Sequence, residues 1–257
     1  MAMFESLPHL ALRARRDVLR MTTSAGSGHP GGSLSSLDIY ILLLAIKTDA
    51  DTLVVSHGHT AAGLYAALAR FGYIDGEAAV QGFRRMGSPF EGHPSLDVPG
   101  VAWCSGALGQ GLSVGCGYAL AAQKLQTGGH VYVVMGDGEQ AKGQLCEARE
   151  FAVAHRLSNL TAIVDCNGLQ ASGSLDEVLH QDIAAKHEAA GWAALEADGH
   201  EFDALYDALR TLRQAGKPGV LLAHTVMGKG VPGHENDYTF HGNPLKPAEL
   251  EAILECS

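Results

Sequence analysis

Two short apolar segments, each ending in polar residues, constrain the fold of this chain more than any other feature. The segment 130–135 (HVYVVM) leads directly into Gly136-Asp137-Gly138, and the segment 160–165 (LTAIVD) leads into Cys166-Asn167-Gly168. Short apolar runs rich in β-branched residues are typical of buried strands. Between them, 144–155 has the apolar spacing of a helix. This order predicts a right-handed βαβ unit with two parallel strands.

The rest of the chain repeats this alternation. Further strands are expected at 52–56 and 219–224, and helices at 8–21, 36–46, 60–71, 182–190 and 201–214, with one more after the glycine-rich turn 106–111 and a short one at the end. Strands that alternate with helices predict an α/β fold, in which a parallel sheet is flanked by helices on both faces. With no repeat or low-complexity linker visible, residues 1–257 are expected to form a single domain.

Composition excludes several classes of function. The net charge is −10, so the chain lacks the basic footprint of a nucleic-acid-binding protein. The longest apolar run, Ile39–Ile46, is too short to cross a bilayer, and the N-terminus lacks the pattern of a signal peptide. No CxxC occurs, and the number of cysteines is odd, which favours buried thiols in a reducing cytoplasm: Cys104, Cys116, Cys146, Cys166 and Cys256.

The polar ends of the two central strands form the first candidate site. In a parallel βαβ unit both following loops lie at the carboxyl edge of the sheet, so Asp137 and Asn167 can converge there. A carboxylate and an amide oxygen are ligands that Mg²⁺ prefers, together with phosphate oxygens. The flanking glycines allow backbone N–H groups to approach a diphosphate. Taken singly, GDG can be a tight turn and NG an ordinary loop dipeptide, but together they favour a site.

These strand ends and three further segments resemble motifs of a known family. The segment 136–173 resembles the thiamine-diphosphate (ThDP) motif, and specifically its transketolase version, in which the asparagine is followed by glycine and an apolar residue. Three more segments resemble transketolase motifs in the correct order: SGHPGGSLSSLDI (27–39), SGALGQGLSVGCGYALA (105–121) and GKGVPGHENDYTFHGNPL (228–245). A dinucleotide-binding interpretation of the second is weak, because its spacing is not GxGxxG and no suitable strand precedes it.

The resemblance implies a set of cofactor ligands. Asp137, Asn167 and the backbone carbonyl of Leu169 would hold Mg²⁺, with Ca²⁺ or Mn²⁺ as substitutes, and Gly138 would lie against the diphosphate. The thiazolium and diphosphate side of ThDP would be lined by three residues of the glycine-rich turn: Gly106, Ala107 and Leu108.

Four of the thirteen histidines stand at positions that resemble the family's substrate- or cofactor-contacting histidines. A lone histidine is more often structural, but imidazoles suit sugar chemistry because they donate, accept and relay protons near neutral pH. By the resemblance, His29 and His241 would contact the donor hydroxyls and the diphosphate edge. His59 would contact the cofactor, and His93 would relay a proton at the cleaved bond.

A transketolase also uses a glutamate that presses on the cofactor's aminopyrimidine ring, and the resemblance places it in a pyrimidine-binding domain that this sequence does not show. We therefore expect a second subunit to carry that domain and the family's C-terminal domain, in a heterotetramer that places the cofactor at the interface. The expected activity is transfer of a two-carbon ketol unit from a ketose or ketose phosphate donor to an aldose acceptor. An inactive remnant is the opposing possibility, which the retained motifs disfavour.

The sequence also departs from the family pattern. Lys142 stands where the family has an acidic residue thought to couple paired sites, whereas Glu147 matches a second acidic position. Ala107 replaces a proline, His57 replaces an asparagine or lysine, and Ser95 stands where an acid often follows GHP. The changes at His57 and Ser95 are expected near the substrate entrance, which favours an unusual donor or acceptor.

Two other interpretations remain open at this point. One is a different ThDP enzyme, either resembling 1-deoxyxylulose-phosphate synthase or the α subunit of a 2-oxoacid dehydrogenase, which share GDG and Asn but not the full set of motifs. The other is a non-catalytic regulatory protein, which should show no metal-dependent cofactor binding.

Overall fold

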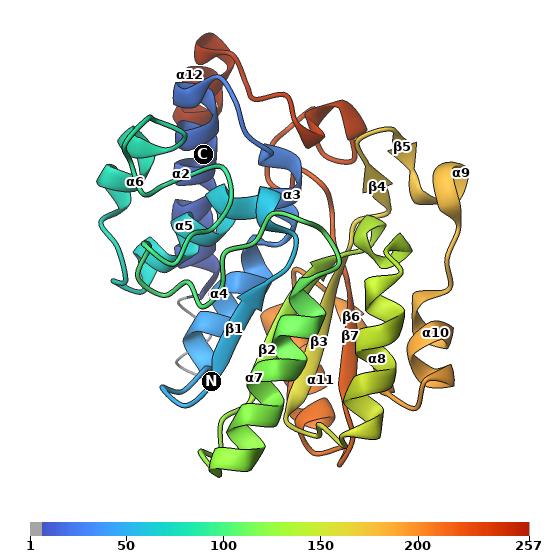
Figure 1. Cartoon of the computed structure of the whole chain (residues 1–257). Helices are drawn as coiled ribbons and strands as arrows, with labels where there is room; N and C mark the ends of the chain where they lie inside the picture. The colour runs from blue at the N-terminus through green and yellow to red at the C-terminus, as the bar shows by residue number, and fades with distance from the viewer. Residues whose placement is uncertain (1–6, 257) are drawn as a thin grey trace.

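A five-stranded, wholly parallel sheet forms the centre of the molecule (Figure 1), in a computed structural model that describes residues 7–256. Its spatial order is β1 (Thr52–Val55), β2 (Val131–Gly136), β3 (Leu160–Cys166), β7 (Gly219–His224) and β6 (Ala193–Asp198). Because all five strands run the same way, their carboxyl ends share one edge. The predicted strands β2 and β3 are neighbours there, with Gly136 opposite Asp165.

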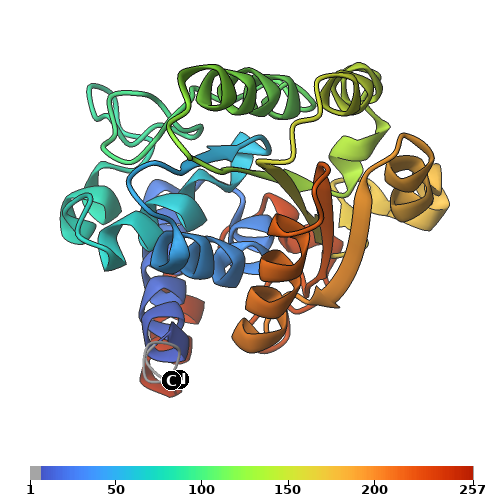
Figure 2. The same ribbon diagram turned by 90° about the horizontal axis from the view of Figure 1, so that it is seen from below.

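Helices cover both faces of the sheet, which confirms the predicted fold class (Figure 2). On one face lie α7 (Gly111–Leu125), α8 (Gln144–Ala154) and α10 (Ile183–Ala189). On the other lie α4 (Leu37–Ile46) and α11 (Phe202–Arg213), with α2 (Leu7–Ala25) and α5 (Ala61–Arg70) packed outside them. The remaining elements are α3 (Pro30–Ser35), α6 (Gly76–Gly82), α9 (Leu175–Leu179), α12 (Pro247–Cys256), the 3₁₀ turns Gly58–Thr60, Gly138–Ala141 and Tyr238–His241, and the hairpin of β4 (Leu169–Gln170) and β5 (Gly173–Ser174).

The central strands are buried on both sides, which explains their uninterrupted apolar character. Val133 of β2 packs into the core under α7, whereas Val134 packs into the core on the opposite face, and both are fully buried. Parallel strands covered by helices on both faces show such continuous apolar runs instead of an alternating pattern. Their burial holds the strand ends, and the polar residues that follow them, in fixed positions.

Strand β6 was not predicted; its segment lies between the helices expected at 182–190 and 201–214. It lies at the sheet edge and is only partly buried, with Glu196 and Asp198 among its exposed residues. An edge strand with charged residues has little of the signal that identifies a buried strand. The predicted loop around His29 also contains a short helix, α3, which begins with Pro30, a residue well suited to the first turn.

The expectation of buried thiols is wrong for two cysteines. Cys104 and Cys146 are exposed, Cys116 is buried and Cys166 is partly buried; all four are free thiols. Cys146 is exposed because it lies on the outer face of α8, next to the inward-facing Leu145.

Parts of the earlier expectations fall on residues that the structure does not describe. The side chain of Cys256 lies outside the described residues, as do residues 1–6, on which the signal-peptide expectation partly depends. Within residues 7–256, no helix combines the length and the apolar character needed to cross a membrane.

Candidate functional site

The carboxylate of Asp137 joins the ends of β2 and β3. Its Oδ1 accepts a hydrogen bond from the N–H of Gly138 at 2.7 Å, and its Oδ2 accepts one from the N–H of Gly168 at 2.7 Å. Gly168 has φ = +73°, a left-handed conformation that glycine adopts without steric cost. The acid from one strand end therefore contacts the loop that carries the amide from the next.

Asn167 is also fixed in orientation. Its Oδ1 accepts a hydrogen bond from the N–H of Leu169 at 3.0 Å, and its Nδ2 donates to Ser35 Oγ at 3.2 Å. Asp137, Asn167 and Leu169 all line the same cavity. The predicted convergence of the acid and the amide is therefore present in the structure.

Burial makes the free carboxylate of Asp137 unfavourable. Its side chain is almost fully buried, and this desolvation, reinforced by the nearby Asp165, raises the pKa of Asp137 to about 7 despite the two backbone hydrogen bonds. A buried acid with a raised pKa gains from a cation beside it, because the cation favours the charged form.

Asp165, the single acidic residue of β3, has a different environment. Its Oδ2 accepts hydrogen bonds from Ser35 at 2.6 Å and Ser36 at 2.5 Å, and its Oδ1 accepts one from Thr225. Three hydroxyls from two separate segments thus converge on one buried carboxylate. Asp165 thereby ties the start of the chain, around α3, to the sheet edge.

Glu139, which follows the GDG motif, fixes the glycine-rich turn. It is 2% exposed, and its Oε1 accepts from the N–H of Gly109 at 2.5 Å and from the Ser56 hydroxyl, while Oε2 accepts from the N–H of Gly136 at 3.1 Å. Gly111 also approaches Ser56 so closely that a Cβ would lie 2.4 Å from the serine Cβ. This buried contact holds the turn that opens α7 against the strand ends.

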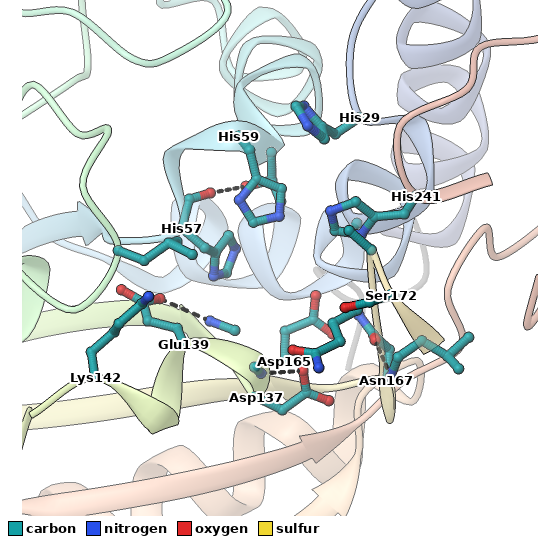
Figure 3. A pocket seen from close by; sticks show the side chains of 18 of the residues that line it. His29, His57, His59, Asp137, Glu139, Lys142, Asp165, Asn167, Ser172 and His241 are labelled. Carbon is teal, nitrogen blue, oxygen red and sulfur yellow. Dashed lines mark hydrogen bonds between the residues drawn. The ribbon is translucent and has the colours of Figure 1, made fainter. Parts of the chain in front are cut away.

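A cavity of about 410 Å³ lies between these strand ends and the loops above them (Figure 3). Every site residue predicted from the sequence lines it except Ala107, whose neighbours Gly106 and Leu108 do. Residues that reach it without having been predicted include Glu139, Asp165, Gln170 and Ser172.

The predicted histidines gather on the side of the cavity opposite the acids (Figure 3). The ring centroid of His29 is 5.1 Å from that of His59 and 5.4 Å from that of His241, and the rings of His59 and His241 are 5.3 Å apart. His93 also lines the cavity but is more exposed. Residues more than two hundred positions apart in the sequence therefore form one cluster.

These imidazoles favour the neutral form. Burial, followed by the neighbouring His241, Arg84 and His93, lowers the pKa of His29 to about 4. Burial lowers the pKa of His59 well below its usual value, and it also lowers the pKa of His241. The Nδ1 atoms of His29 and His241 are buried without a hydrogen-bond partner among the described residues, so they can accept or donate to a bound molecule.

The residues that depart from the family pattern lie in different places. His57 lines the deep part of the cavity, 1% exposed, and its Nε2 is 2.7 Å from Tyr40 Oη and 3.2 Å from Ser36 Oγ. Lys142 lines the cavity with an exposed side chain. Ser95, expected near the entrance, is not among the lining residues and instead donates to Asp97 at 3.1 Å.

The sequence did carry a signal for the two acids that were missed. Asp165 lies within an apolar strand segment and Glu139 lies shortly after one, where an unpaired buried charge is costly. Their burial was therefore inferable, but their hydroxyl and amide partners come from distant segments and were not. Among the described residues, no group of three or more His, Cys, Asp or Glu side chains is arranged to hold a metal, so a metal here needs amide, carbonyl or ligand oxygens as well.

Comparison with known proteins identifies the family to which this arrangement belongs. Residues 11–255 match the family described as "Transketolase, thiamine diphosphate binding domain". The chain belongs to this family. It is thus a transketolase-type ThDP-binding domain, in agreement with the motif order in the sequence.

The relatives fall into two size classes. The chain is 36% identical over 269 residues to one of the subunits of the apulose-4-phosphate transketolase of Phocaeicola vulgatus, with 98% of this chain and 94% of that protein covered. It is 35% identical over 266 residues to the transketolase of Homo sapiens, but there the match covers 98% of this chain and 42% of the relative. The chain therefore spans less than half the length of the larger relatives.

Solved structures show the same relationship. The transketolase of Campylobacter jejuni superposes with a TM-score of 0.92 at 30% identity, covering 98% of this chain and 42% of that chain. The transketolase of Leishmania mexicana gives a TM-score of 0.90 at 28% identity, with 96% and 40% covered. Nearly the whole chain thus has the fold of the matched part of these transketolases.

Proposed function

We propose that this chain is the ThDP- and Mg²⁺-binding subunit of a two-chain transketolase. The observation that carries the proposal is the convergence of Asp137 and Asn167, from neighbouring strand ends, on one cavity with the histidine cluster. This arrangement places an oxygen-rich cation site beside groups suited to sugar hydroxyls, within a domain of the transketolase family.

The residues present suit the metal. Asp137 would supply a carboxylate oxygen, Asn167 an amide oxygen and Leu169 a backbone carbonyl, all hard ligands that Mg²⁺ accepts together with diphosphate oxygens. The two backbone hydrogen bonds that orient Asp137 fix its position before any ion binds. A divalent cation would also offset the burial that raises the pKa of Asp137.

Residues around the cavity also suit the cofactor's charged tail. Gly106 lines the cavity, and a Cβ there would meet no atom within 4 Å, so that residue leaves space for a bound molecule. His59 and His241 can donate to diphosphate oxygens, and Gly138 allows close approach. When bound, ThDP supplies a carbanion that forms and cleaves the carbon–carbon bond next to a ketone.

The histidines would orient the substrate and move protons. His29 and His241 have unpartnered Nδ1 atoms that can bond the hydroxyls of a ketose donor. His93, the most exposed of the four, would take and return the proton of the hydroxyl at the cleaved bond. Neutral imidazoles suit this task because they both accept and donate.

The partner chain would supply the parts of a transketolase active site that lie outside this domain. A relative of nearly the same length is named as one of the subunits of a transketolase, which supports a second chain here, with a pyrimidine-binding domain and its glutamate. We propose a cytoplasmic heterotetramer in which residues 1–257 form one domain. The substrates would be ketose and aldose sugars or their phosphates, and apulose 4-phosphate is a donor to be tested because of the relative's name.

Reconstitution tests the proposal. The chain and its partner are purified together, ThDP and Mg²⁺ are added, and ketol transfer is measured from xylulose 5-phosphate and from apulose 4-phosphate. Pyruvate decarboxylation is measured in parallel. Transfer from a ketose that depends on both chains and on Mg²⁺ is the expected result.

Two outcomes would contradict it. Decarboxylation of pyruvate without ketol transfer would indicate a different ThDP enzyme. Calorimetry that detects no Mg²⁺-dependent ThDP binding in the complex would indicate a regulatory protein.

A further inference from the structure

Arg84 connects the two segments that carry His29 and His93, although it is not among the residues that line the cavity. Its Nη1 donates to Ser27 Oγ at 2.6 Å, two positions before His29. Its backbone N–H donates to the carbonyl of Phe90 at 2.8 Å, in the loop that leads to His93. A single residue thus bonds to both histidine-bearing segments.

The guanidinium packs directly on the second of these segments. A Cβ on Gly92, the neighbour of His93, would lie 2.6 Å from Arg84 Nε and 2.8 Å from Nη2. No side chain larger than hydrogen fits there unless the guanidinium moves. Arg84 Nε is buried and has no acceptor among the described residues, so its place is set by packing as well as by hydrogen bonds.

The backbone of Arg84 is held in an unusual conformation. Its φ is +54°, in the left-handed region that residues with a side chain rarely adopt. Such strain persists where the surrounding contacts hold it, and it is concentrated at functional sites. Glycine would adopt this conformation without strain, but it would lack the guanidinium that bonds to Ser27.

We propose that Arg84 is a positioning residue of the transketolase site, which fixes the segments of His29 and His93 relative to each other and places one positive charge behind both imidazoles. The catalytic meaning of this inference rests on the proposed function, but the geometry does not. Arg84 touches neither the predicted metal ligands nor the cavity, so it acts through the histidines.

Electrostatics agrees with this geometry. After burial and His241, Arg84 is the next cause that lowers the pKa of His29, with His93 a smaller one. For His93, burial and then Arg84 lower the pKa. A fixed guanidinium therefore favours the neutral form of the two imidazoles expected to handle substrate hydroxyls.

Three variants of the whole chain separate the parts of this proposal. Arg84→Gln removes the charge and most of the N–H donors of the guanidinium. Arg84→Lys retains the charge. Gly92→Ala pushes the guanidinium aside while leaving Arg84 itself unchanged. Arg85→Gln is the matched control, because it removes an equal charge from the exposed neighbouring residue.

The first readout is NMR titration of the histidine ring protons, which needs no partner chain. We expect the pKa values of His29 and His93 to rise in Arg84→Gln. In Arg84→Lys and Arg85→Gln they should stay near those of the wild type. In Gly92→Ala the pKa of His93 should rise. The second readout is ketol transfer by the complex. We expect kcat/KM to fall on the order of ten- to a hundredfold in Arg84→Gln, since small misplacements of catalytic groups have effects of this size, with partial recovery in Arg84→Lys.

The inference is overturned if His29 and His93 titrate identically in Arg84→Gln, Arg85→Gln and the wild type. If Arg84→Gln fails to fold, the titration of His93 in Gly92→Ala is the deciding measurement. An unchanged pKa of His93 in that variant also overturns the inference. A complex that transfers no ketol from any ketose refutes the proposed function, while the histidine titrations still test the role of Arg84.

Discussion

The two sides of the cavity are built in different ways. The acidic side is formed by four polar residues at or after the ends of β2 and β3: Asp137, Glu139, Asp165 and Asn167. The histidine side is formed by the residue before α3, two 3₁₀ turns and a loop: His29, His59, His93 and His241. On the acidic side each carboxylate oxygen named above accepts a hydrogen bond within the chain, whereas on the histidine side two buried ring nitrogens have no partner among residues 7–256.

Under the proposed function, this difference separates a preorganised ion-binding side from a substrate-recognising side. Groups that bind an ion must be fixed beforehand, because reorganisation in a buried site is costly. Groups that bind a variable sugar keep unused hydrogen-bonding capacity, which a ligand then satisfies. The acidic side should therefore respond to substitution with loss of cofactor or stability, and the histidine side with loss of activity.

The largest expected effect is at Asp137. Asp137→Asn removes the proposed anionic metal ligand while keeping the side-chain shape, and the affinity of the complex for ThDP with Mg²⁺ should fall at least about a hundredfold, since even residues behind metal ligands contribute ten- to a hundredfold. Isothermal titration calorimetry measures this. Asp176→Asn, which removes an exposed carboxylate, is the control. Unchanged affinity in Asp137→Asn would show that the acidic side does not bind the metal.

Glu139 should affect the fold more than the chemistry. Glu139→Gln leaves a single acceptor oxygen for contacts from Ser56, Gly109 and Gly136, and turns an amide N–H₂ toward a donor. Loss of buried bonds to a charged group should lower the free energy of unfolding by about 2 kcal/mol. Urea denaturation gives this value, and Glu150→Gln, on the exposed face of α8, should leave it unchanged. Equal stability of the two variants would contradict the structural role of Glu139.

On the histidine side, His29→Asn should leave the fold intact and reduce kcat/KM by about tenfold. A factor of this size corresponds to the free energy of about one hydrogen bond to the substrate. Steady-state kinetics of the reconstituted complex measures this, and His9→Asn, an exposed histidine of α2, serves as the control. A large loss of stability with unchanged kinetics would reverse the contrast between the two sides.

The smallest expected effect is on acid stability. The pKa of His29 is lowered from 6.5 to about 4 in the folded chain, so between these values the unfolded chain binds the extra proton. The contribution of His29 to stability is therefore present above about pH 6.5 and is lost as the pH falls toward 4. After discounting for partial exposure, His29→Asn should resist acid better than the wild type by roughly 1 kcal/mol near pH 4. Thermal unfolding at pH 7, 5.5 and 4 checks this, and parallel curves would contradict it.

The sheet centre and the acid–amide pair were predictable because local pattern and chain topology suffice to place them. The apolar runs of β2 and β3 identify buried strands, and parallel topology then places Asp137 and Asn167 at one edge. Strand β6 was not predictable in this way, because an edge strand with charged residues lacks the apolar signal. Its place is set by pairing with β7, which lies later in the sequence.

The residues that meet in the cavity were predictable from the sequence, but their supporting contacts were not. The resemblance to transketolases named the four histidines, and the structure brings them to one cavity. The resemblance did not indicate that Glu139 holds the glycine-rich turn, that Asp165 binds three hydroxyls or that Arg84 joins two loops. Each of these depends on partners from distant segments, and one sequence without structure does not specify such pairs.

By itself the sequence determined which segments are buried, which strand ends are polar and in which order the family's motifs follow one another, because these properties are local to the chain. The tertiary structure alone decided which side chains meet across the cavity, which of their atoms are already satisfied and which remain available to a ligand. Hydrogen-bond partners and desolvation depend on every segment that packs around a group, so the pKa values of Asp137 and His29 belong to the folded chain and not to their motifs.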